Sequence, residues 1–151
     1  MSRLDCVLFI DRSTRAKRPE RRYPMSPESK SVKMVSLACL ILGIIGLAIS
    51  VYVFVGTSYD LTFKFLFLAM PLEIATYGFT GARAANVPSE IPEFAKQAAW
   101  SPLFCIVVLG DCYMKIKFEN SLVLGAAVVC TVLSVILALV ANKAGKAIKS
   151  A

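Results

Sequence analysis

Long apolar runs separated by short polar segments dominate the chain. The clearest run extends from Met34 to Val55 without a charged residue or a proline. A helix rises about 1.5 Å per residue, so a run of this length can cross the roughly 30 Å hydrocarbon core of a bilayer. A second uncharged run fills residues 121–141. The two runs predict transmembrane helices at about residues 32–55 and 121–141.

The next apolar stretch, residues 61–82, is interrupted by polar residues but is long enough to span. Lys64 stands near its start, where a long side chain can reach the membrane surface, and Pro71 stands at its middle, where it removes one helical hydrogen bond. Only residues 56–60 separate this stretch from the first span. A linker this short predicts an antiparallel helical hairpin.

The remaining span is predicted at about residues 98–118. Trp100 at its beginning and Tyr113 towards its end suit the two membrane interfaces. The alternative for this stretch is a re-entrant or interfacial helix, because its uncharged part is short. Residues 83–97, which contain two prolines, are predicted to form a loop at the membrane surface.

Together these elements predict an all-α integral membrane protein, an antiparallel four-helix transmembrane bundle with a basic N-terminal arm. The arm is residues 1–31 and the transmembrane domain is residues 32–151. The arm is rich in arginine and lysine and carries three prolines, so we expect a solvated segment attracted to anionic lipid headgroups. The alternative for the arm is a mitochondrial transit peptide.

The distribution of basic residues predicts the orientation. In a four-span topology, all of the 17 lysines and arginines except Lys64, Lys115 and Lys117 fall on one side of the membrane. Positive charge concentrates on the cytoplasmic side of membrane proteins. Both termini are therefore predicted to lie on the cytoplasmic, matrix or stromal side.

The first and last spans each carry small residues at alternating intervals of three and four, which place them on one helix face. Small side chains allow two helices to approach closely, so the two spans are predicted to pack through these faces. In the first span the face consists of Ser36, Cys39, Gly43, Gly46 and Ser50, and in the last span of Ala127, Thr131, Ser134, Ala138 and Ala141.

Two acids, Glu73 and Asp111, are predicted to lie within the membrane. A carboxylate at that depth is costly unless it is protonated or paired, so each is a candidate functional residue. Lys64, Tyr77 and Lys115 are the candidate charge or hydrogen-bond partners, with Tyr77 and Lys115 each one helical turn after an acid. The alternatives are a proton or cation site formed by the two acids and separate, local neutralisation of each.

The composition argues against several classes of function. Histidine is absent, which removes haem ligation by histidine and every Ser-His or Cys-His catalytic pair. The five cysteines form no CxxC pair, and we interpret them as small apolar packing residues. No catalytic set, metal site or cofactor site is predicted, and no nucleic-acid partner.

These features favour a non-catalytic protein: an accessory or structural subunit of a larger multi-subunit membrane complex, with membrane lipids and other membrane subunits as partners. A respiratory-type complex of the mitochondrial inner membrane is the favoured setting, and the endoplasmic reticulum is next. The alternative is a small oligomeric proton- or cation-coupled transporter or channel that uses Glu73 and Asp111. A membrane enzyme with unlocated chemistry is the third hypothesis.

Overall fold

A computed structural model describes residues 26–116 and 120–150. The regular structure of these residues is entirely helical, which confirms the predicted all-α class. Most of the predicted N-terminal arm, residues 1–25, lies outside the described residues, as do 117–119 and 151. The elements are α2 (Pro27–Gly56), α3 (Leu61–Ala84), the 3₁₀ helix η1 (Pro88–Glu90), α4 (Ile91–Ala98), α5 (Ser101–Ile116) and α6 (Ser121–Ser150).

Four helical stretches are long and apolar enough to cross a membrane. They are α2, α3, α6 and the combined stretch Pro88–Ile116, which joins η1, α4 and α5. The number of spans and the approximate positions of three of them agree with the sequence pattern. The outward-facing residues are largely apolar, as expected for a surface in contact with lipid.

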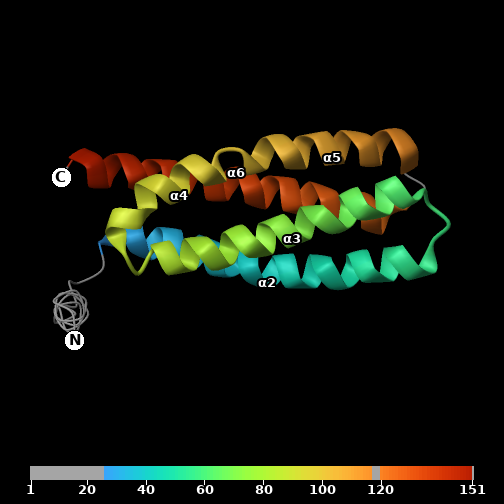
Figure 1. The fold of residues 1–151 in the computed structure, drawn as a ribbon, viewed down its shortest axis with the longest axis horizontal. Helices are drawn as coiled ribbons and strands as arrows, with labels where there is room; N and C mark the ends of the chain where they lie inside the picture. Colours follow the sequence, from blue (N-terminus) through green and yellow to red (C-terminus); the bar gives the residue numbers. More distant parts are fainter. Residues whose placement is uncertain (1–25, 117–119, 151) are drawn as a thin grey trace, which may run out of the picture.

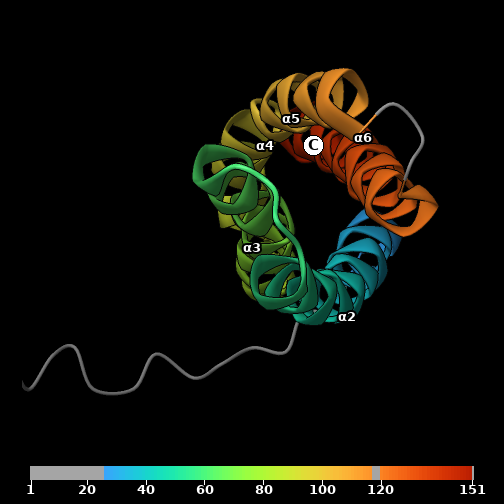
Figure 2. The same cartoon turned by 90° about the vertical axis from the view of Figure 1, so that its right-hand side faces the viewer.

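The four stretches lie side by side around a common axis. Figure 1 shows the beginning of α2 and the end of α6 at one end of the molecule, and the link between α2 and α3 at the other. The view along the axis (Figure 2) shows α2 flanked by α3 and α6, with α4 and α5 closing the ring between them. Each helix therefore has two neighbours and one outward face.

The first helix begins earlier than the apolar run does. The side-chain oxygen of Ser26 accepts a hydrogen bond from the backbone N–H of Ser29 at 3.2 Å, and Pro27 occupies the first helical turn. A proline there loses no helical hydrogen bond, since the first N–H groups of a helix have no partner within it. The helix thus includes residues 27–31, which were predicted to belong to the arm.

The predicted loop at residues 83–97 is largely helical, and the third candidate span begins well before residue 98. Pro88, Pro92 and Pro102 stand in the first turns of η1, α4 and α5 rather than in helix interiors, so they begin helices without disrupting them. The buried residues of α4 are Ile91, Phe94, Ala95 and Ala98. This apolar face packs against α6 and, through Phe94, against Tyr77 and Gly81 of α3.

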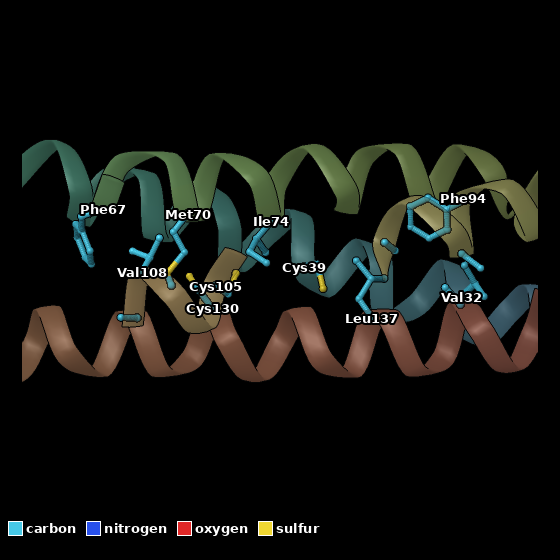
Figure 3. Close-up of a cluster of buried hydrophobic side chains, with 14 of the residues drawn as sticks. Val32, Cys39, Phe67, Met70, Ile74, Phe94, Cys105, Val108, Cys130 and Leu137 are labelled. Carbon is cyan, nitrogen blue, oxygen red and sulfur yellow. The ribbon is translucent and has the colours of Figure 1, made fainter. Parts of the chain in front are cut away.

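The interior is filled with side chains along its length. Figure 3 shows Phe67, Met70 and Ile74 of α3 pointing towards residues of α5 and α6, with Phe94 and Val32 near one end. All of these are at most 3% exposed. Close packing of this kind stabilises membrane bundles through van der Waals contact, since lipid supplies little hydrophobic driving force between helices.

Candidate functional site

The helix α3 has two contrasting seams, one with α2 and one with α5. At the α2–α3 seam, the backbones of the two helices approach each other closely. A Cβ atom added at Gly43 would stand 2.7 Å from the backbone nitrogen of Ala75, and one at Gly78 would stand 2.5 Å from the backbone nitrogen of Leu40. No side chain larger than hydrogen fits at either position, so the two backbones touch here.

Pro71 is accommodated on the same seam. Proline has no N–H, which leaves the carbonyl of Phe67 without its usual helical donor. The hydroxyl of Ser50 on α2 donates to this carbonyl at 3.3 Å. The Pro71 ring lies against Gly46, where an added Cβ would be 2.8 Å from the Cβ of Pro71. The small face of α2 thus makes room for the proline and supplies its missing hydrogen bond.

The predicted small face of α2 is buried throughout, and that of α6 only in part. Ala127, Ser134 and Ala141 are buried, whereas Thr131 and Ala138 are only half-buried. The two helices do pack together, but the closest backbone approach of α2 is to α3. The face of α3 that packs against the small face of α2 was not predicted. Its residues Pro71, Ala75, Gly78 and Gly81 recur at intervals of three and four, a signal that was present in the sequence.

The α3–α5 seam has a different character because it contains a carboxyl group, that of Glu73, beside a buried hydroxyl. Glu73 is half-buried at the middle of α3, and its carboxyl lies beside the hydroxyl of Ser101, the fully buried first residue of α5. The Ser101 hydroxyl is placed to donate to this carboxyl, although the geometry falls short of a full hydrogen bond. By the same geometric criterion, four buried polar atoms of the described residues have no partner: Ser36 Oγ, Glu73 Oε2, Ser101 Oγ and Asp111 Oδ2. The positive end of the α5 helix dipole partly compensates the negative charge of the carboxylate.

The side chains predicted to accompany Glu73 have other contacts. Tyr77 lies near Glu73, but no hydrogen bond joins these two described residues, and its ring packs beside Phe94 with centroids 6.5 Å apart. Lys64 donates from Nζ to the carbonyl of Phe54 at 2.9 Å and to that of Thr57 at 2.5 Å. Lys64 therefore caps the C-terminal end of α2 and does not pair with Glu73.

Asp111 is neutralised locally, as one of the two sequence hypotheses expects. Lys115 Nζ lies 3.3 Å from Asp111 Oδ2 one turn along α5, and also stands over the ring of Phe63, 5.8 Å from its centroid. Asp111 is about 15 Å further along α5 than Ser101, at about 1.5 Å per residue. The structure does not bring Glu73 and Asp111 together, so they do not form one site.

Four cysteines are buried as free thiols: Cys39, Cys105, Cys112 and Cys130. Figure 3 shows Cys39, Cys105 and Cys130 directed into the interior from α2, α5 and α6. Within residues 26–116 and 120–150, no three histidine, cysteine, aspartate or glutamate side chains are grouped so that they could hold a metal ion. The Cys39 thiol lies 3.9 Å from the carbonyl of Leu133, to which it donates. The buried polar side chains of the described residues are those of Ser29, Ser36, Ser50, Ser101 and Ser134.

Comparison with protein families, with curated proteins and with solved structures gives no match to this chain.

Proposed function

We propose that the chain is a non-catalytic integral membrane protein that serves as an accessory subunit of a larger membrane complex. Its four spans cross the membrane as an antiparallel bundle, with both termini on the cytoplasmic, matrix or stromal side. The basic N-terminal arm lies on that side, near anionic headgroups. The proposal assigns the protein the task of joining other membrane subunits rather than carrying out a reaction.

The observation that carries this proposal is the state of Glu73. A carboxylate at the centre of a membrane-spanning helix costs several kcal/mol unless it is protonated or paired. Among the described residues Asp111 forms an ion pair with Lys115, whereas Glu73 has no basic partner and has only the Ser101 hydroxyl beside its carboxyl. A neighbouring subunit that neutralises Glu73 would remove this cost on assembly.

The packed interior favours a subunit over a channel within the single chain. A conducting path needs polar groups along its length. The interior here is lined by apolar side chains of all four spans, and the acids Glu73 and Asp111 lie at separate depths. A respiratory-type complex of the mitochondrial inner membrane is our first hypothesis for the setting, followed by the endoplasmic reticulum.

The native size of the protein tests the proposal. The full chain, tagged at its C-terminus, is extracted from its own membrane in mild detergent, and its native mass and co-purifying chains are measured. An assembly much larger than 16.4 kDa that contains defined partner chains in fixed ratio would support the subunit role. A monomer or a homo-oligomer without partners would contradict it, and ion-flux measurements would then test Glu73 as a transport residue.

A further inference from the structure

We propose that the α3–α5 seam is the docking surface for a transmembrane helix of a different protein, and that this helix carries a lysine or arginine near mid-membrane which pairs with Glu73. The inference rests on the proposed function, because it names the kind of partner that a subunit role requires. The inference is argued from three observations: the shape of the seam, the Glu73 carboxyl without a basic partner, and the positions of the described basic residues of this chain.

The seam is open to an incoming helix. A shallow apolar groove of about 450 Å³ runs between α3 and α5, and it ends one helical turn from Glu73. Ala69, in its wall, lies one turn before Glu73 on α3, and Phe104 lies one turn after Ser101 on α5. The residues that line it are Leu61, Thr62, Phe65, Leu66, Ala69 and Phe104.

The carboxyl group beyond the end of this groove can accept a donor from outside. Glu73 is half-buried and so remains accessible from the outer surface, while Oε2 is buried. Ser101, one turn before Phe104 on α5, is 0% exposed, so an incoming group can reach Glu73 but not the Ser101 hydroxyl. An ammonium or guanidinium group donates several hydrogen bonds and neutralises the carboxylate at the same time.

The described part of a second copy does not offer such a group at the depth of Glu73. Its basic residues stand near the ends of their spans or in the segments between them; Lys96, five residues before Ser101, is about 7.5 Å away at about 1.5 Å per residue, and the others are further away. They are Lys30, Lys33, Lys64, Arg83, Lys96, Lys115, Lys143, Lys146 and Lys149. The charge is therefore expected from another protein whose spanning helix carries a basic residue deeper in the membrane.

Site-specific photo-crosslinking in the native membrane tests this assignment. Phe104, an aromatic residue in the wall of the groove, is replaced by p-benzoylphenylalanine in the full chain. The matched control carries the same photo-reactive residue at Tyr52, which is 69% exposed on the outer face of α2. After irradiation, mass spectrometry identifies the attached peptide, and each measurement is repeated with Glu73→Gln.

The expected result is an adduct at position 104, absent at position 52, on a transmembrane segment with a lysine or arginine in its central third. Its yield should fall about tenfold or more with Glu73→Gln, because a buried charge left without its partner is strongly unfavourable. An adduct only with lipid, with a second copy, or with a segment lacking a central basic residue would overturn the inference, as would an adduct that Glu73→Gln leaves undiminished. In those cases a large native assembly would still support the subunit role, whereas a protein without partners would contradict both.

Discussion

The two seams of α3 show opposite ways of using a membrane-buried helix face. Towards α2, glycine and serine let the backbones touch, and Ser50 supplies the hydrogen bond that Pro71 removes. Towards α5, Glu73 brings a carboxyl group without a basic partner against the buried hydroxyl of Ser101. The difference teaches that the α2–α3 seam holds the chain together by close packing, whereas the α3–α5 seam carries an acid whose charge, as we propose, a partner neutralises.

The largest effect on stability is expected at Gly78. Its added Cβ would lie 2.5 Å from the backbone nitrogen of Leu40 and 2.7 Å from the carbonyl oxygen of Ser36, and backbone atoms cannot move aside cheaply. Gly78→Ala should lower the free energy of unfolding by about 3 kcal/mol, measured by denaturant titration in detergent.

Gly125→Ala is the matched control, because a Cβ at Gly125 meets nothing within 4 Å. It should leave stability unchanged or raise it by about 0.5 kcal/mol, as expected for alanine in place of glycine within a helix. Equal losses for the two variants would contradict the close approach of α2 and α3.

Removing the charge of Lys64 should have the next largest effect. Lys64→Met deletes the donor to the carbonyls of Phe54 and Thr57, at a cost of about 1–2 kcal/mol for charge-assisted hydrogen bonds. Hydrogen exchange should increase at the C-terminal end of α2 and not near Ser26. Uniform protection along α2 in the variant would show that Lys64 does not cap this helix.

Ser50 and Pro71 should be coupled energetically. Ser50→Ala should cost about 1 kcal/mol, the scale of hydrogen bonds between membrane helices. With Pro71→Ala, the residue at position 71 regains an N–H for the Phe67 carbonyl, so Ser50→Ala should then cost clearly less. A double-mutant cycle measures this difference, and strict additivity would show that Ser50 does not compensate the proline.

The Asp111–Lys115 pair should contribute little. The pair stands in the last two turns of α5, where the long side chain of Lys115 can reach the membrane surface, and ion pairs exposed to water contribute about 0.5 kcal/mol or less. Asp111→Asn should therefore change neither the free energy of unfolding nor the native assembly appreciably. A loss of assembly in this variant would indicate that Asp111, and not Glu73, is the acid required for assembly.

The first and last spans could be predicted from the sequence because residues 34–55 and 121–141 contain no charged residue and no proline to interrupt the apolar pattern. The third span was misjudged at its start, because Pro88 and Pro92 were interpreted as loop residues although both stand in first helical turns. The pairing of Asp111 with Lys115 followed from local spacing. The contact between Glu73 and Ser101 could not be predicted from local spacing, because Ser101 belongs to another helix and only tertiary packing brings it beside Glu73.

The central claim is that Glu73 serves assembly and not the fold of the single chain. The most direct test measures both properties in Glu73→Gln, which keeps the shape of the side chain and removes its charge. We predict an unfolding free energy no lower than that of the unmodified chain, because glutamine removes the cost of an unpaired carboxylate, together with loss of the large native assembly in mild detergent. An assembly of unchanged size, or a variant that no longer folds, would contradict the account.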